Sequence, residues 1–142
     1  MISVHQLLQR KGGEVFSIDA ESPVLEAIRL MADHHVGALI VLKEGAMVGI
    51  VSERDYARKV VLHGRSSSET PVWQIMSAPV ETVAPDSSVA DCMRRMTEKR
   101  IRHLPVVRGE RLIGVVSIGD LVKAVIEDQQ QTIEQLETYI RS

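Results

Sequence analysis

Short apolar runs alternate along this chain with stretches whose apolar residues recur every three or four positions. Residues 36–42 are almost continuously apolar and predict a strand buried on both faces; a polar turn leads from it into a second strand at residues 47–51. Residues 15–18 predict a further short strand. Residues 24–32 carry an apolar face at helical spacing, and the Ser-Pro pair before them is typical of a helix start, with Ser22 as the expected N-cap.

This strand–helix–strand–strand–helix pattern occurs twice. Residues 49–55 recur as residues 114–120, and each stretch runs from Gly through two apolar residues to Ser and, three residues later, Asp. An internal repeat decides the fold class, and this one predicts an α/β (α+β) protein. We place the first repeat at residues 1–64, the second at 65–128 and a helical extension at 129–142.

The second copy repeats the elements of the first. Short helices are expected ahead of the two copies, after Ser3 and after Thr70-Pro71. The expected elements of the second copy itself are a strand near 80–83, a helix over 88–99, and strands at 104–107 and 112–116.

Residues 102–107 of the second copy read Arg-His-Leu-Pro-Val-Val. Tandem copies with this segment and with the Gly-apolar-apolar-Ser-x-x-Asp ending resemble a pair of cystathionine β-synthase (CBS) domains, also called a Bateman module. The resemblance covers about residues 1–128, nearly the whole chain. It implies two repeats packed about a pseudo-twofold axis, with ligand clefts between them and a regulatory role.

The resemblance also implies which residues bind ligands. In each repeat they come from the first strand, the middle strand and the strand–helix junction. The first site would comprise Ser17, Ile18, Val36, Ala38, Ile40, Ser52, Arg54 and Asp55. The second site would comprise Thr82, Val83, Ile101, Arg102, His103, Pro105, Ser117, Gly119 and Asp120.

The chemistry of the two junctions suits a nucleotide. Asp55 and Asp120 are each able to accept hydrogen bonds from two vicinal ribose hydroxyls. Ser52 and Ser117, at the starts of helices, suit a phosphate, because the first turn of a helix attracts anions. The alternative is structural, since Ser and Asp are common at helix starts for capping alone; we expect the helix of the first junction to begin at Asp55.

The two predicted sites differ in charge. Arg54 suits a phosphate, because its guanidinium forms a planar fork, whereas Gly119 stands in the corresponding place of the second copy. Arg102 and His103 bring charge to the second site from another strand, where the first copy has small residues. We therefore expect the two sites to hold different adenine ligands. The alternative for Arg54 is a solvated surface charge.

Composition narrows the remaining classes. The net charge of −2 and the absence of a basic stripe argue against nucleic-acid binding. Cys92 is the only cysteine and is expected to be a small core residue. Adjacent His34 and His35 do not share a helix face, so no metal is expected. With no signal segment and no membrane-length apolar run, we expect a cytoplasmic protein and no membrane.

The C-terminal stretch has an apolar seam. Val122, Ile126, Ile133, Leu136 and Ile140 follow steps of four and three, with Gln129 as a polar member. Such a seam is typical of a coiled coil, so we expect a homodimer. The alternative is an amphipathic tail that packs on its own domain.

These observations predict a sensor rather than an enzyme. No catalytic residues and no catalytic cofactor are expected, and the ligand would be an adenine nucleotide: AMP and/or NAD(H), with ATP or ADP also open. The signal would pass to an unknown target protein. The alternatives are an S-adenosylmethionine sensor, which would leave Arg54 without a phosphate, and a purely structural interaction module.

Overall fold

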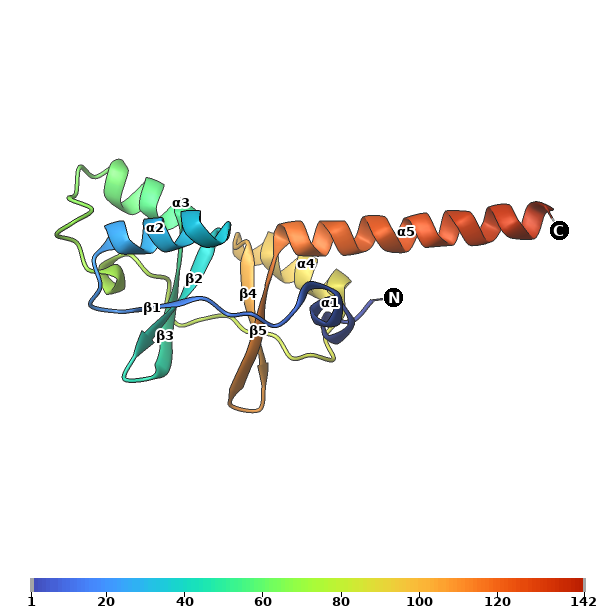
Figure 1. Cartoon of the computed structure of the whole chain (residues 1–142), viewed down its shortest axis with the longest axis horizontal. Coiled ribbons are helices and arrows are strands. Elements are labelled where there is room, and N and C mark those ends of the chain that lie inside the picture. The colour runs from blue at the N-terminus through green and yellow to red at the C-terminus, as the bar shows by residue number, and fades with distance from the viewer. Residues whose placement is uncertain (1, 142) are drawn as a thin grey trace. The chain divides into compact units, whose positions relative to one another are not determined.

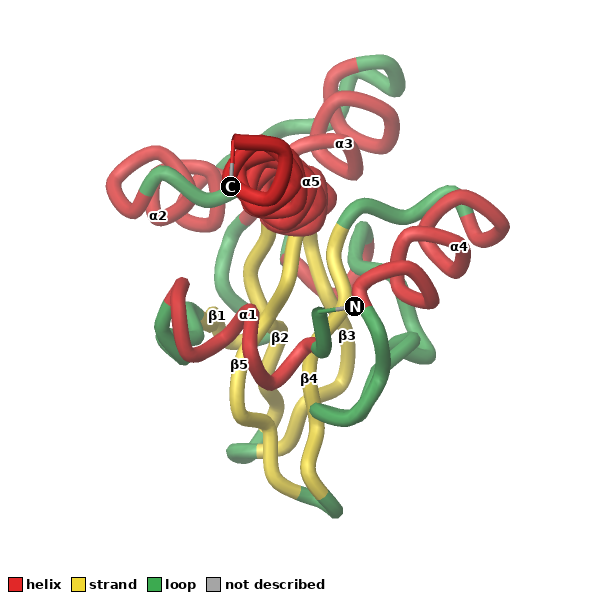
Figure 2. Tube along the Cα trace, turned by 90° about the vertical axis from the view of Figure 1, so that its right-hand side faces the viewer, coloured by secondary structure: helices red, strands yellow, loops and turns green. Residues whose placement is uncertain are grey.

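The computed structural model describes residues 2–141. They form two compact units. Residues 15–80 make up one, which we call the continuous unit. The other, which we call the composite unit, combines residues 2–14 with residues 81–141. Figure 1 shows the elements of both units, and Figure 2 separates helices from strands by colour.

The continuous unit is a three-stranded sheet with helices. Strand β1 is parallel to β2, and β2 is antiparallel to β3. Its elements are β1 (Ser17–Asp19), α2 (Val24–His34), β2 (Ala38–Lys43), β3 (Ala46–Ser52), α3 (Glu53–Tyr56), a π-helical turn (Ala57–Val61) and a 3-10 turn (Val72–Gln74).

The composite unit has a two-stranded antiparallel sheet and three α-helices. The strands β4 and β5 form a hairpin, and α5 follows β5 directly (Figures 1 and 2). Its elements are α1 (Val4–Lys11), α4 (Val89–Lys99), β4 (His103–Arg108), β5 (Arg111–Ser117) and α5 (Ile118–Arg141).

The two hairpins have the same register. Ala38 lies opposite Ser52 in the β2–β3 hairpin, and His103 lies opposite Ser117 in the β4–β5 hairpin. Each hairpin has one register shift, at corresponding positions of β2 and β4. Both middle strands are buried at their centres. For β2 this confirms the prediction made from its continuous apolar run.

The strand expected near 80–83 does not form. Only Val83 pairs with its neighbour, through one parallel bridge to Val106. In the first repeat the Ile40 N–H donates to the Phe16 carbonyl at 3.0 Å, but the residue that corresponds to Ile40 is Pro105, which has no N–H. The pairing is therefore shorter in the second repeat.

The short segment that precedes each repeat packs against the other repeat. The N–H of Val4 donates to the Ser87 carbonyl at 2.8 Å, so the start of the chain is bound to the loop before α4. In the continuous unit, the N–H of Val72 donates to the Ser22 carbonyl at 2.9 Å. The predicted division at residue 64 follows the sequence repeats, whereas the compact units divide the chain differently because each leading segment packs with the other repeat.

Two helix starts differ from the expectation. Helix α2 begins at Val24 with Pro23 as its N-cap and with no capping side chain, so the prediction of a Ser22 cap is wrong. The Ser22 carbonyl is instead occupied by the Val72 N–H. Helix α3 begins at Glu53 rather than at Asp55.

Helix α5 has 24 residues and is buried only near its start, at Leu121 and Ala124. Its outer turns run past α1 and α4 (Figure 1). The seam residues Ile126, Ile133 and Leu136 are 60%, 48% and 56% exposed, so the seam does not pack on the chain's own domain. None of the described helices is long and apolar enough to cross a membrane.

Candidate functional site

Each strand–helix junction is closed by a reciprocal pair of hydrogen bonds. At the end of β3, the Asp55 N–H donates to Ser52 Oγ at 3.2 Å, and the Ser52 N–H donates to Asp55 Oδ2 at 2.9 Å. At the end of β5, the corresponding distances between Asp120 and Ser117 are 3.1 and 2.9 Å. This is a capping box, in which Ser is the cap and Asp the third residue of the helix. The capping alternative thus describes part of what these residues do.

A lysine neutralises each aspartate, but the two lysines come from different places. In the continuous unit, Lys59 Nζ lies 3.1 Å from Asp55 Oδ1, one turn along the same helical segment, and donates to the Ile75 carbonyl. In the composite unit, Lys11 Nζ lies 2.5 Å from Asp120 Oδ2. Lys11 ends helix α1, more than a hundred residues before Asp120 in the chain.

The Asp120 carboxyl is held in its ionised form. Burial alone would raise its pKa, but hydrogen bonds from Lys11 and from Ser117 outweigh burial and bring the pKa below its ordinary value. The side chain remains 25% exposed. An ionised, partly exposed carboxylate accepts hydrogen bonds and donates none, which suits a ligand that offers hydroxyl groups.

The other residues of the first predicted site surround its junction unevenly. The strand pairing places Ala38 beside Ser52. Val36, Ala38 and Arg54 are half-buried, and Ser17 is exposed at the edge strand β1. Ile18 and Ile40 are only 5% and 1% exposed, so they present almost no surface to a ligand in this structure.

In the second predicted site, His103 lies beside Ser117 at the base of the hairpin. The Ile118 N–H donates to the Arg102 carbonyl at 2.9 Å, which joins the start of β4 to the start of α5. Arg102 is exposed and Ile101 half-buried, while Val83 and Pro105 are buried. The Thr82 carbonyl accepts from Arg95 at 3.2 Å.

Gly119 leaves open space at the second junction. A Cβ built on it would meet only Ser117 Oγ, at 3.7 Å, which is an ordinary contact. Its backbone does not require glycine. The missing counterpart of Arg54 is therefore a difference of side chain and not of backbone.

Sequence reasoning missed both lysines. Lys59 follows Asp55 by four residues, and this helical spacing could have identified the pair. Lys11 carries no such signal, because its contact with Asp120 depends on how α1 packs within the composite unit.

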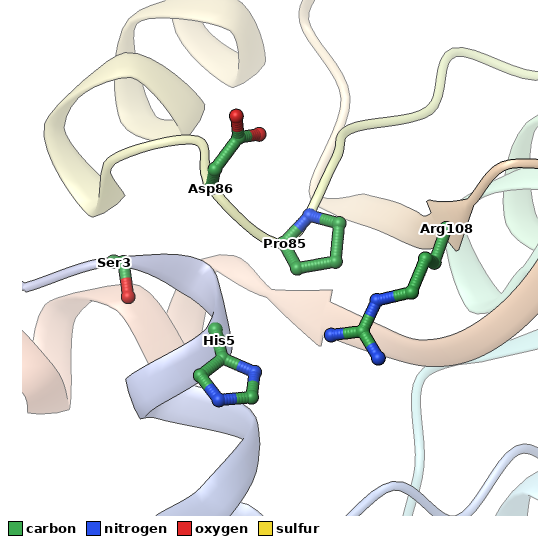
Figure 3. Close-up of a pocket in the computed structure, with 5 residues that line it drawn as sticks. All are labelled: Ser3, His5, Pro85, Asp86 and Arg108. Carbon is green, nitrogen blue, oxygen red and sulfur yellow. The ribbon is translucent and has the colours of Figure 1, made fainter.

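A shallow hollow also occurs in the composite unit. It has a volume of about 530 Å³ and is lined by Ser3, His5, Pro85, Asp86 and Arg108. Figure 3 shows the His5 and Arg108 side chains facing each other across it, with Asp86 directed elsewhere. It contains no residue of either predicted site, and Ser3 Oγ already caps α1.

The remaining candidate groups have structural roles. Within residues 2–141 no group of His, Cys, Asp or Glu is arranged to hold a metal ion, and the His34 ring stacks on Phe16 with centroids 4.0 Å apart. Cys92 is buried in the core of the composite unit. Burial, followed by the charge of Asp91, raises the pKa of its thiol.

Comparison with known proteins identifies the family. The model of the CBS domain matches residues 6–62 and 72–127. The "CBS domain-containing protein CBSX3, mitochondrial" of Arabidopsis thaliana is 43% identical over 126 residues, which cover 85% of this chain and 61% of that protein. This chain thus spans less than two thirds of that relative's length.

Solved structures agree. A protein described as a signal-transduction protein with CBS domains, from Burkholderia ambifaria, is 50% identical with a TM-score of 0.87, over 90% of this chain and 96% of that one. The hexameric CBS-CP12 protein of bloom-forming cyanobacteria is 28% identical with a TM-score of 0.77, over 86% and 70% of the two chains. The duplicated strand–helix junctions and these matches together show that the chain belongs to the CBS-domain family, whose modules are generally regulatory and bind nucleotides.

Proposed function

We propose that the protein is a sensor that binds adenine nucleotides, AMP and/or NAD(H), through Asp55 and Asp120 and passes the signal to a partner protein. One observation carries the proposal: both units hold an aspartate in the same geometry at a strand–helix junction, with Ser N–H to Asp Oδ2 distances of 2.9 Å. Capping explains the bonds within each junction, but it does not require carboxylates that are also partly exposed and paired with lysine.

Ribose is the part of the ligand that these carboxylates would recognise. Two vicinal hydroxyls donate, and an ionised carboxylate offers acceptor sites only. In the first unit a phosphate would be bound by Arg54. The Ser52 hydroxyl would bind it only after releasing the hydrogen bond that it donates to Asp55 Oδ2. Relatives are named as CBS domain-containing or signal-transduction proteins and not as enzymes, which supports a regulatory output.

Calorimetry with AMP, ATP, NADH and S-adenosylmethionine tests the proposal. Asp120→Ala should weaken binding of the preferred nucleotide at its junction by about 1.5–3 kcal/mol, as expected for hydrogen bonds to a charged group. Asp55→Ala should do the same at the other junction, and 2′-deoxy analogues should lose much of the difference.

Asp86→Ala is the matched control, because Asp86 is an exposed carboxylate of the composite unit outside both junctions. Correctly folded Asp55→Ala and Asp120→Ala chains that bind AMP like the parent would refute the ribose role. Binding of S-adenosylmethionine in preference to every phosphate-bearing ligand would support the alternative sensor.

The seam of α5 supports a homodimer formed by a second copy of the same helix. Ile126, Ile133 and Ile140 occupy one heptad position, and Val122, Gln129 and Leu136 occupy the other. Ile at the first position with Leu at the second, as at Leu136, favours two parallel strands. Each exposed side chain of this kind contributes about 1.5–3 kcal/mol when it becomes fully buried.

Light scattering tests the helical dimer. Ile133→Lys should dissociate it, because a charge would enter the seam, whereas Gln131→Lys on the opposite face should not. An unchanged dimer in Ile133→Lys would place the interface elsewhere. A cytoplasmic location stays a prediction; the Arabidopsis relative is named as mitochondrial, and fractionation of cells that express the protein distinguishes the two.

A further inference from the structure

The two aspartates differ in which carboxylate oxygen the protein occupies. At Asp55, Oδ2 accepts from the Ser52 N–H and hydroxyl, and Oδ1 faces Lys59 Nζ at 3.1 Å. At Asp120, the Ser117 N–H and Lys11 Nζ both bind Oδ2, at 2.9 and 2.5 Å. Neither the Ser117 N–H nor Lys11 binds Oδ1 of Asp120, and the Ser117 side chain adds a hydrogen bond to the same carboxyl group.

This difference matters for a ligand with two vicinal hydroxyls. Each carboxylate oxygen has about two lone-pair positions. The lysine of the second junction leaves Asp120 Oδ1 to other partners, whereas the lysine of the first junction faces Asp55 Oδ1. The Asp55 side chain is also more buried, at 13% exposed against 25% for Asp120. Asp120 is thus the better prepared acceptor.

Lys11 is the residue that holds Asp120 in this arrangement. Its ammonium group also donates to the Val115 carbonyl at 2.6 Å, so it links the end of α1 to strand β5 and to the carboxylate. By holding Oδ2, it restrains the rotation of the carboxyl group. The second repeat has no lysine at the corresponding place on its helix, because Ala124 occupies the position that corresponds to Lys59.

We propose that Lys11, supplied by the N-terminal helix α1, is the positioning residue that prepares Asp120 for a vicinal diol and makes the second junction the tighter of the two. The inference rests on the proposed nucleotide-binding function. In the first junction Lys59 has the opposite effect, since it occupies an oxygen that the ribose needs. Binding at Asp120 is consequently coupled to the packing of α1, and binding at Asp55 is not.

Calorimetry with AMP on single-junction chains tests the proposal. In an Asp55→Ala background, Lys11→Ala should weaken AMP binding at Asp120 at least fivefold, and Lys11→Arg should restore most of it. Arg10→Ala is the matched control: Arg10 lies in the same helical turn and pairs with Glu127 on α5 at 3.6 Å, but not with Asp120. It should change binding less than twofold. In an Asp120→Ala background, Lys59→Ala should leave binding at Asp55 equal or tighter.

A second readout is independent of the ligand. Carbon-detected NMR titration should show that Lys11→Ala raises the pKa of Asp120, since Lys11 is the first group that lowers it, and that Arg10→Ala does not. A parent chain that binds no adenine nucleotide would refute the proposed function and this inference with it. A parent that binds AMP, with a folded Lys11→Ala chain that binds it equally well at Asp120, would overturn this inference alone.

Discussion

The junctions at Ser52–Asp55 and Ser117–Asp120 have the same backbone and different surroundings. In both, the Ser N–H donates to Asp Oδ2 at 2.9 Å. The counter-charge comes from the same helical segment in one and from the far end of the chain in the other. The comparison teaches that a duplicated sequence reproduces local geometry, whereas single substitutions and long-range packing decide how each copy is charged and how open it is.

The largest expected effect concerns the glycines that let the leading segments approach the hairpins. A Cβ on Gly114 would lie 2.8 Å from Leu8 Cδ2, and one on Gly49 would lie 2.5 Å from Met76 Sδ. Leu8 is held in helix α1, whereas the unbranched Met76 side chain adapts, and only the Ser77 carbonyl oxygen, 3.1 Å from the same Cβ, is fixed by the backbone. Gly114→Ala should therefore lower the free energy of unfolding by about 2–3 kcal/mol and Gly49→Ala by about 1 kcal/mol.

Chemical denaturation measures both costs. Gly119→Ala is the control, because its Cβ meets nothing closer than 3.7 Å, and it should be neutral or stabilising by up to about 1 kcal/mol. If Gly49→Ala lowered the free energy of unfolding more than Gly114→Ala, the expectation that Met76 adapts more easily than Leu8 would be wrong.

A smaller effect should sharpen the difference in phosphate recognition. In an Asp120→Ala background, Arg54→Ala should reduce the preference for AMP over adenosine by about 1–1.5 kcal/mol, since Arg54 is half-buried and a guanidinium binds phosphate as a fork. In an Asp55→Ala background, Gly119→Arg should increase that preference at the second junction.

Calorimetry with the two ligands decides this prediction. Arg54→Lys keeps the charge without the planar fork and should retain part of the preference. If the Arg54→Ala chain discriminates AMP from adenosine as the parent does, Arg54 does not bind the phosphate, and the alternative of a solvated surface charge holds.

The sequence predicted the elements that depend on local pattern. The hairpins, helix α4 and the Ser3 cap of α1 follow from apolar runs and capping residues, and the structure confirms them. The prediction of a strand near 80–83 was wrong because that strand depends on a residue in the neighbouring strand. Pro105 has no N–H and cannot form the hydrogen bond that Ile40, its counterpart in the first repeat, donates to Phe16.

The candidate site was predictable to a smaller extent. The repeated Ser and Asp residues were evident, and the structure holds each pair in one junction. The contact of Lys11 with Asp120 was not, because no periodicity relates residues 109 positions apart. Burial of Ile40 likewise depends on packing, so a strand residue that the family resemblance suggested offers only 1% of its surface.

The exchange of leading segments has a consequence for the order in which the protein can assemble during synthesis. Residues 15–80 contain every core residue of the continuous unit, so it is complete while the chain is still being made. Residues 2–14 leave the ribosome before the rest of the composite unit, and they have no packing partner until α4 and β5 have been translated. Residues 2–14 are therefore expected to fold after residues 15–80, although they are translated earlier. Their apolar residues Val4, Leu7 and Leu8 stay available to chaperones throughout that interval.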